Sequence, residues 1–441
     1  MSSRAVLAGL VAAAILLSVS LAWRGVERVR REREAAALVQ KADARLGAGL
    51  LEAPALDRLQ ASTARAALSQ ALELGVSDDQ RTHVEGELDY ARAIEALEEG
   101  DLPKAETALD SARARLGWTA RLRVLAGTLA WRRTDLAEAT LHANAALSLA
   151  PDDPRALLLS GALALARGEP KAALAALEGL ARRVPKSGYV ADRLGRAREA
   201  TGDLEGAEAA YRDAVRLNER DLEAWIDLGR ALRAAHQPEL SKTAFSTALA
   251  AAHTPGEEAQ ARLGRGLAAM DLGLADAAAA DFQRAADLAP NDPAPALALG
   301  DLYLRARRID EALVYYREAT DRDGQDPTAW LKLGNALVAD AALDDAVRAF
   351  DKALALAPDL AAAHNGRGAA LMHAGHPDAA RKAFERAAAL DPTDANPWLN
   401  LGLLDEAAHD EAAAREDWRA ALARDPGSEV ARAKLDAPAA R

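Results

Sequence analysis

The sequence predicts an all-α protein, a solenoid of helical hairpins that follows an N-terminal transmembrane helix. Three observations predict this fold. Hydrophobic residues make up 50% of the 441-residue chain but aromatic residues only 4%, so the apolar content is mostly Ala and Leu, which favour helices. Glycine, alanine and aromatic residues recur with a stride of 34 residues over most of the chain. A run without charged residues precedes this periodic part.

The N-terminal run has the length of a membrane span. No residue from Ala5 to Trp23 is charged, and Arg4 and Arg24 flank the run. At ~1.5 Å rise per residue, this run nearly crosses a ~30 Å hydrocarbon layer. We predict an uncleaved anchor over residues 1–24. The alternative is a secretory signal, because Ser20-Leu21-Ala22 has the small residues of a cleavage site.

The charges around this run predict the side of the membrane. Arginines are more frequent after the run than before it, at positions Arg24, Arg28, Arg30, Arg31 and Arg33. Positive residues stay preferentially in the cytoplasm, which favours a single-pass protein of the bacterial inner membrane with its repeats in the cytoplasm. The preference is small, because Glu27, Glu32 and Glu34 are interleaved, and a periplasmic location remains the alternative.

Residues 25–85 connect the anchor to the periodic region. Residues 26–47 form a charged helical pattern, and residues 54–74 form a second one after the break at Gly47-Ala48-Gly49. We expect the two helices to make a degenerate hairpin that caps the array.

The periodic region begins near residue 86. Glycines mark the stride, with one longer step of 37 residues, at Gly127, Gly161, Gly195, Gly229, Gly266, Gly300, Gly334, Gly368 and Gly402. Aromatic residues follow sixteen positions later at Tyr211, Phe245, Phe282, Tyr316, Phe350, Phe384 and Trp418. Small residues let two helices approach closely, while the aromatic ring fills the gap between neighbouring hairpins. We therefore expect all these rings in the core.

The pattern resembles that of the tetratricopeptide repeat family, which has W-x2-L-G-x2-Y, then A-x3-F, then P. Trp330-Leu331-Lys332-Leu333-Gly334, Ala346, Phe350 and Pro358 match it. The resemblance implies a right-handed superhelical solenoid of ten units over residues 86–426, each a pair of helices A and B. The units start near Gly86, Ala120, Pro154, Gly188, Leu222, Ala259, Pro293, Pro327, Ala361 and Ala395. Residues 427–441 are predicted to form a C-terminal capping helix and tail.

Composition and spacing argue against several functions. The net charge of −12 disfavours a nucleic-acid binder, which needs clustered Lys and Arg. The absence of cysteine excludes disulfides and thiolate chemistry. The repeats leave no room for a catalytic domain, so we predict no enzyme, no catalytic residue and no cofactor.

Two short motifs have structural interpretations. Gly264-x-Gly266 and Gly366-x-Gly368 fall inside predicted helices, whereas a phosphate loop follows a strand. His364, His373 and His376 are close in sequence, but no carboxylate stands convincingly beside them, so we predict no metal site.

Two groups of residues are candidates for binding a partner. Trp131 is expected to face the concave surface with Arg121, Arg132 and Arg155 around it, an arrangement suited to an acidic or extended segment. A half-buried structural tryptophan is the alternative.

Asparagines make the second candidate group, on the inward-facing turns of the last three units, at Asn335, Asn365, Asn396 and Asn400. Amides both donate to and accept from a peptide backbone. Solvated polar residues are the alternative.

The sequence therefore predicts a membrane-tethered scaffold that binds a partner protein or peptide in the concave groove of the repeats. The alternatives are a cell-envelope assembly factor and a regulatory subunit of an enzyme complex. Self-association is also compatible with the Ala-rich outer faces. The partner's identity is not encoded in the repeat pattern.

Overall fold

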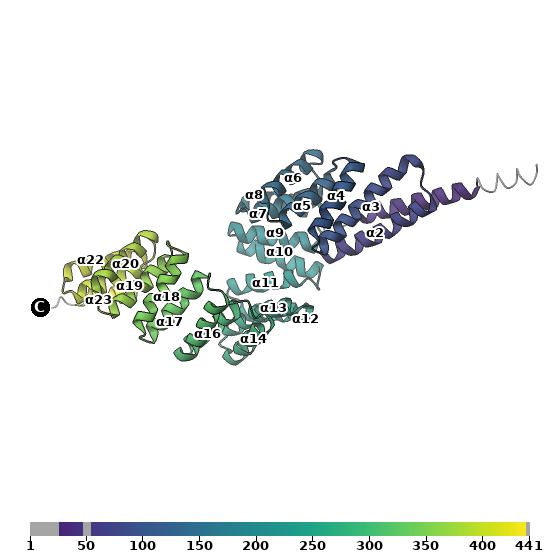
Figure 1. Ribbon diagram of the computed structural model, residues 1–441. Coiled ribbons are helices and arrows are strands. Elements are labelled where there is room, and N and C mark those ends of the chain that lie inside the picture. Colours follow the sequence, from purple (N-terminus) through teal and green to yellow (C-terminus); the bar gives the residue numbers. More distant parts are fainter. Residues whose placement is uncertain (1–25, 47–53, 438–441) are drawn as a thin grey trace, which may run out of the picture. The chain divides into compact units, whose positions relative to one another are not determined.

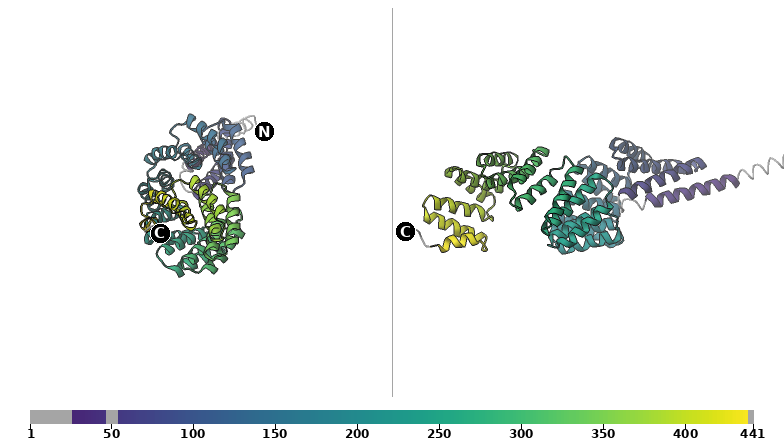
Figure 2. Two further views of the ribbon diagram at one scale, coloured as in Figure 1. Left: turned by 90° about the vertical axis from the view of Figure 1, so that its left-hand side faces the viewer. Right: turned by 90° about the horizontal axis from the view of Figure 1, so that it is seen from below.

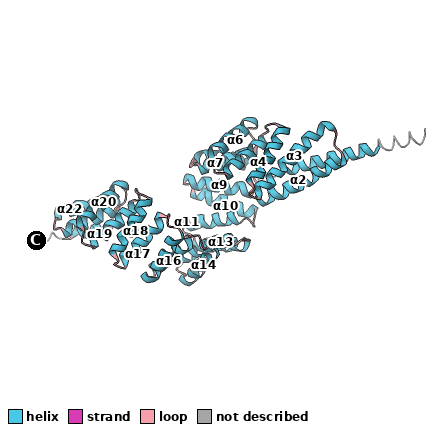
Figure 3. Cartoon of the chain, in the orientation of Figure 1, coloured by secondary structure: helices cyan, strands magenta, loops and turns pink. Residues whose placement is uncertain are grey.

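The computed structural model describes residues 26–46 and 54–437. Every regular element in these ranges is a helix (Figure 3), so the prediction of an all-α helical-repeat solenoid is confirmed. No helix of the described residues is both long and apolar enough to cross a membrane. The predicted transmembrane segment, residues 1–24, lies outside the described residues.

The chain forms two compact units, Met1–Ala231 and Leu232–Arg441, coloured along the chain in Figure 1. The first unit begins with a helix over residues 26–46. It continues with α2 (Pro54–Leu74), α3 (Asp78–Glu98), α4 (Leu102–Leu116), α5 (Ala120–Arg132), α6 (Leu136–Leu149), α7 (Pro154–Ala166), α8 (Pro170–Arg183), α9 (Gly188–Thr201) and α10 (Leu204–Leu217). The boundary between the units falls within α11 (Leu222–Ala234).

The second unit continues the same pattern of paired helices. It contains α12 (Pro238–Ala251), α13 (Pro255–Asp271), α14 (Ala275–Leu288), α15 (Ala294–Arg305), α16 (Ile309–Arg322), α17 (Pro327–Ala339), α18 (Leu343–Leu356), α19 (Ala361–His373), α20 (Pro377–Leu390), α21 (Asn396–Ala407), α22 (Glu411–Arg424) and α23 (Glu429–Asp436). Odd-numbered helices pack against the even-numbered helix that follows them, from α3 to α9 in the first unit and from α13 to α21 in the second, as in α3 with α4 and α13 with α14. Figure 2 shows these hairpins stacked side by side within each unit.

The turn inside each hairpin has a fixed backbone conformation. One residue between the paired helices takes a positive φ, and this residue recurs with the repeat at Gly100, Thr134, Gly168, Gly202, His236, Gly273, Arg307, Ala341, Gly375 and His409. Half of these positions are glycine, which adopts the left-handed region without steric cost. The other half hold side chains in that region, so the hairpin geometry overrides local preference there.

The predicted aromatic positions are in the core. Phe245 is 2% exposed, and Phe282, Phe350 and Phe384 are fully buried. The rings lie against the repeat glycines, since a Cβ added at Gly334 would lie 2.7 Å from Phe350 Cε1. The hairpins that carry these rings therefore close by placing the ring on helix backbone without a side chain, whereas Gly161 of an earlier hairpin faces Leu177.

Two glycine pairs show how one hairpin joins the next. A Cβ at Gly368 would lie 2.5 Å from Phe384 of its own hairpin, whereas a Cβ at Gly366 would lie 2.6 Å from Phe350 of the preceding hairpin. Gly264 and Gly266 contact Phe245 and Phe282 in the same way. Each Gly-x-Gly motif thus lets two aromatic rings, one from its own hairpin and one from the preceding hairpin, pack against the same helix. This agrees with the structural interpretation of these motifs.

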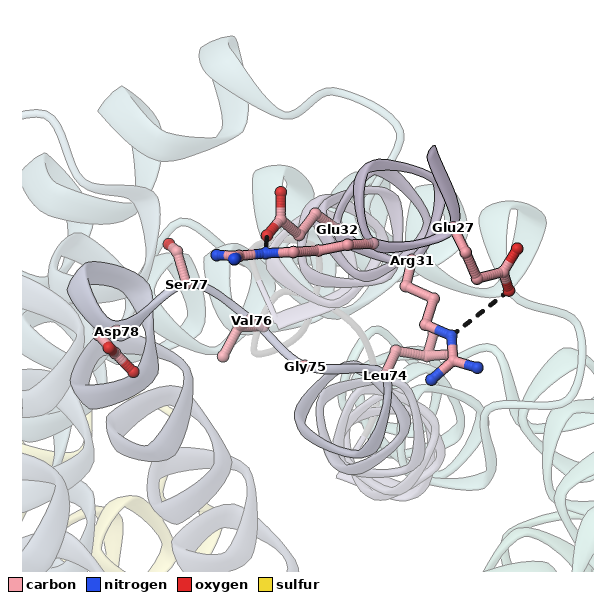
Figure 4. A pocket seen from close by; sticks show the side chains of 9 residues that line it. Glu27, Arg31, Glu32, Leu74, Gly75, Val76, Ser77 and Asp78 are labelled. Carbon is pink, nitrogen blue, oxygen red and sulfur yellow. Dashed lines mark hydrogen bonds and ion pairs between the residues drawn. The ribbon is translucent and has the colours of Figure 1, made fainter. Parts of the chain in front are cut away.

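The helix over residues 26–46 packs on the first repeats. Ala42 and Leu46 are buried in one cluster with residues of α2, α3 and α5. The start of this helix and the turn before α3 enclose a pocket of about 490 Å³. Figure 4 shows Glu27 and Arg31 at this pocket, joined by an ion pair and facing Leu74. The pocket is open and its ionic side chains bond to each other, so we assign it no ligand.

Candidate partner-binding surface

The odd-numbered helices form the inner surface of each unit. In the first unit α3 contacts α5, α5 contacts α7, and α7 contacts α9; in the second, α13, α15, α17, α19 and α21 contact one another in succession. No two even-numbered helices within the described residues contact each other to a similar extent. The odd-numbered helices are therefore crowded together on the inside of the bend, where repeat proteins bind their ligands.

Inner side chains of successive odd-numbered helices meet at a regular offset. Arg196 of α9 donates from Nε to Asp227 of α11 at 2.5 Å, 31 residues later. Lys332 of α17 donates to Asp301 of α15 at 2.8 Å with the same offset. The residues that a repeat presents inward can thus be assigned from contacts as well as from spacing.

The structure brings together three of the four predicted asparagines. Asn400 Nδ2 on α21 donates a 2.9 Å hydrogen bond to Asn365 Oδ1 on α19, and both side chains are half-buried. Asn335 on α17 is exposed, and its Oδ1 lies 3.3 Å from the place that a Cβ of Gly366 would take. The three amides therefore follow one another across three inner helices.

Asn396 does not join this row. It is exposed at the first residue of α21, where its Nδ2 and its backbone N–H both donate to Asp394 Oδ1. Its amide is therefore bonded to the turn that precedes the helix. The prediction that it faces the inner surface missed this local bond, because Asx turns are set by the loop and not by the repeat.

The expected ring of arginines around Trp131 is not formed. The Trp131 ring is half-buried and packs with Leu136 and Leu147 of α6 against a buried cluster. Arg132 is exposed, and none of the guanidinium–ring contacts among the described residues involves Trp131. This geometry corresponds to the alternative of a half-buried structural tryptophan.

Arg121 and Arg155 instead belong to a buried polar cluster at the first three repeats. Arg121 Nη2 donates to Glu87 Oε1 at 2.6 Å, 34 residues earlier, and its guanidinium lies 5.4 Å from the centre of the Tyr90 ring. Arg155 Nη1 donates to the Leu46 carbonyl at 3.2 Å. Burial raises the pKa of the Glu87 carboxyl, against the opposing effect of Arg121. Arg155 thus bonds to the end of the helix over residues 26–46, whereas Arg121 bonds to α3.

A second buried ionic cluster lies between α9 and α11. Asp192 and Asp227 are each 2% exposed, and Arg196 lies between their carboxylates. Burial raises the pKa of Asp192 to about 7, with Asp227 adding to the shift and Arg196 opposing it. No motif in the sequence singled out this cluster, in which only Arg196 and Asp227 have the 31-residue offset described above.

The fourth residue of three odd-numbered helices has a side-chain nitrogen close to a backbone carbonyl in the turn before the helix. Trp225 Nε1 donates to the Glu219 carbonyl at 2.9 Å, and Trp330 Nε1 to the Gly324 carbonyl at 3.0 Å, each six residues earlier. His364 Nε2 lies 2.9 Å from the Pro358 carbonyl with the same separation. His364 therefore replaces tryptophan in a structural role, and it belongs to no group of potential metal ligands among the described residues.

Comparison with known proteins agrees with this architecture. The tetratricopeptide repeat model matches residues 90–154, 124–188, 193–239, 226–293 and 297–361, and a second model of this repeat matches residues 361–394. No curated protein sequence matches the chain significantly.

Several solved structures are similar in fold. Yeast Tom70 aligns at 16% identity and a TM-score of 0.49 over 92% of this chain and 94% of its own. A tetratricopeptide repeat protein from Parabacteroides merdae aligns at 17% identity and a TM-score of 0.44 over 56% of this chain and 96% of its own. YrrB, described as a protein of this repeat with an unusual peptide-binding site, aligns at 19% identity and a TM-score of 0.34 over 43% of this chain and 96% of its own. The matched repeats, taken together, span more than half of the sequence, and the chain belongs to the tetratricopeptide repeat family.

Proposed function

We propose that the protein is a membrane-tethered scaffold that binds an extended segment of a partner protein on the inner surface of its second unit. Proteins of this repeat family mediate protein–protein interaction, and the helical hairpins carry no catalytic arrangement that we can identify among the described residues. The row formed by Asn335, Asn365 and Asn400 is the observation that carries the proposal.

The amide row has the chemistry that an extended backbone needs. Each asparagine offers both a donor and an acceptor, and peptide N–H and C=O groups alternate along a strand at ~3.3 Å per residue. Asn365 and Asn400 are held by each other, so their positions are fixed before a ligand arrives. A fixed site loses less entropy on binding.

The first unit is less suited to the same role. Arg155 binds the Leu46 carbonyl, and Ala42 and Leu46 are buried among residues of α2, α3 and α5. The chain's own helix thus covers a part of the first repeats that a ligand would otherwise contact. This favours the second unit as the site for a partner.

A peptide selection tests the binding role. Peptides that bind the full chain are selected from a random library, synthesised, and measured by fluorescence anisotropy. We expect Asn365→Ala combined with Asn400→Ala to weaken the best peptides by about tenfold or more, because each lost hydrogen bond is worth about 1 kcal/mol. Asn396→Ala is the matched control and should leave the affinity unchanged. Equal affinity for all three proteins would refute the proposed site.

The membrane tether rests on the uncharged residues from Ala5 to Trp23 and on the arginines that follow. We expect the full chain to remain with membranes after alkaline extraction and a chain lacking residues 1–24 to be released. A reporter fused after Arg441 should be active on the cytoplasmic side. Activity on the other side alone would place the repeats in the periplasm.

A further inference from the structure

Three side chains that commonly bind metals meet where the N-terminal helix crosses the first repeat. Asp43 lies on the helix over residues 26–46, and His83 and Glu87 lie four residues apart on α3, so they share one face of that helix. One potential donor atom of each lies within 4.8 Å of those of the other two. No other group of three or more such residues occurs in the described ranges.

The carboxylate oxygens at this place lack partners. Glu87 is 1% exposed; its Oε1 accepts from Arg121, but its Oε2 has no hydrogen-bond partner among the described residues. Asp43 Oδ1 is buried and equally unpartnered within the described ranges. A buried oxygen without a partner is costly, and two neighbouring carboxylates repel each other. A cation between them removes both penalties.

We propose that Asp43, His83 and Glu87 bind one divalent cation of the zinc class and thereby fasten the N-terminal helix to the first repeat. One imidazole and two carboxylates suit Zn²⁺ and its neighbours, whereas Mg²⁺ and Ca²⁺ prefer oxygen alone. Water would complete the coordination. This assignment departs from the sequence-based expectation of no metal site, which considered only the histidines near the C-terminus.

The geometry allows the site to close. Donors bound tetrahedrally at ~2.1 Å from Zn²⁺ lie about 3.4 Å apart, so atoms within 4.8 Å of one another need to approach by at most about 1.4 Å. His83 is exposed, and its ring can rotate without disturbing the core. Arg121 fixes the opposite oxygen of Glu87, which orients Oε2 in the way that outer hydrogen bonds orient metal ligands.

The cation would add a second attachment for this helix. The first is the bond from Arg155 to the Leu46 carbonyl, at the end of the helix. Asp43 stands about one turn earlier. With both attachments in place, the linker between the predicted anchor and the repeats would be held at two points. The proposal concerns this chain's own assembly, so its outcome does not depend on the partner-binding role.

Calorimetry with zinc chloride tests the site. The full chain is purified in non-ionic detergent without a histidine tag, treated with a chelator, and titrated. We expect one site per chain, and we expect His83→Ala and Asp43→Asn each to weaken binding by about tenfold or more. His142→Ala is the matched control: His142 lies four residues after Glu138, with 3.9 Å between Nε2 and Oε1, and it has no third ligand in the described ranges.

Hydrogen exchange then tests the link between the helices. Zinc should slow amide exchange over residues 26–46 in the unchanged protein and in His142→Ala, but not in His83→Ala. The absence of saturable binding, or binding that survives both His83→Ala and Asp43→Asn, would overturn the site. Binding without slower exchange of residues 26–46 would overturn its fastening role.

Discussion

The ring of Tyr211 lies directly on the backbone of Gly195, sixteen residues earlier in the same hairpin. A Cβ added at Gly195 would lie 2.6 Å from Tyr211 Cδ1 and Cε1. Tyr211 is fully buried, and its hydroxyl donates to Glu199 Oε2 at 2.8 Å. The ring is thus held at both ends, so it cannot move aside for a larger residue.

Gly195→Ala should therefore destabilise the first unit by about 1–3 kcal/mol, as overpacking of a core does. The matched control is Gly179→Ala, in the middle of α8, where a Cβ would meet nothing within 4 Å. This second change should stabilise by about 0.5–1 kcal/mol, because alanine favours helix over glycine. Urea unfolding monitored by circular dichroism measures both. Stabilisation by both substitutions would show that the ring does not close the hairpin.

Exchanging glycine and alanine at the positive-φ position of the turn should change stability in opposite directions in two repeats. Ala341 has φ 59° and Gly375 has φ 82° at equivalent turns, and both are exposed. Ala341→Gly should stabilise the second unit by about 1 kcal/mol, because a side chain is strained in the left-handed region. Gly375→Ala should destabilise it by a similar amount. Unfolding midpoints of the two variants would move in the same direction if the turn conformation did not matter.

Asp192 predicts a pH dependence of stability. Its folded pKa is raised by burial to about 7 from 3.8, so the folded protein holds a proton there that the unfolded chain releases above about pH 4. The free energy of unfolding should fall as the pH rises from about 4 to 7 and then level off. Arg196 and Arg193 oppose the shift, and Asp227 and Asp221 add to it.

Asp192→Asn removes this group, so the variant should gain stability relative to the unchanged protein between pH 5 and pH 8. Urea titrations at several values of pH provide the comparison. Asp391→Asn is the control, because the hydrogen bond from Thr393 lowers the pKa of Asp391. Any pH dependence of stability that Asp391 causes therefore lies below about pH 5. A constant difference between Asp192→Asn and the unchanged protein would contradict the account.

Trp330 predicts the contribution of the bond between a helix and its preceding turn. Trp330→Phe keeps most of the ring but removes the Nε1 hydrogen bond to the Gly324 carbonyl. We expect a loss of about 1 kcal/mol from that bond, with faster amide exchange at the start of α17. Unchanged exchange there would show that the bond does not hold the turn.

The repeat architecture was predictable because the same contact between a glycine and a large side chain recurs in successive hairpins. Gly334 and Phe350 recur as a pair since only a bare backbone accommodates the ring, and such pairs appear directly as spacing in the sequence. The positive-φ turn was less visible. Only half of its positions are glycine, so sequence alone did not mark Ala341 or Thr134 as turn residues.

The site was predictable only in part, because the contacts of an inner side chain depend on the residues around it and not on the 34-residue repeat. Asn365 and Asn400 were expected to face inward and do bond to each other. Arg121 and Arg155 were assigned to Trp131, yet Arg121 binds Glu87 and Arg155 the end of the helix over residues 26–46. That helix lies outside the repeat, so no periodicity could place it there. The spacing of His83 and Glu87 was the available signal for the proposed cation site.

Photo-crosslinking in cells tests most directly whether the partner occupies the inner surface. A benzophenone amino acid is placed at Asn335, which is exposed on α17 of the inner face, or at Val314, which is 59% exposed on α16 of the outer face. The account predicts one discrete adduct from position 335 and none from position 314, with the Asn335 adduct lost when the peptide selected above is added in excess. Adducts of the same partner from position 314 alone, or from both positions equally, would contradict it.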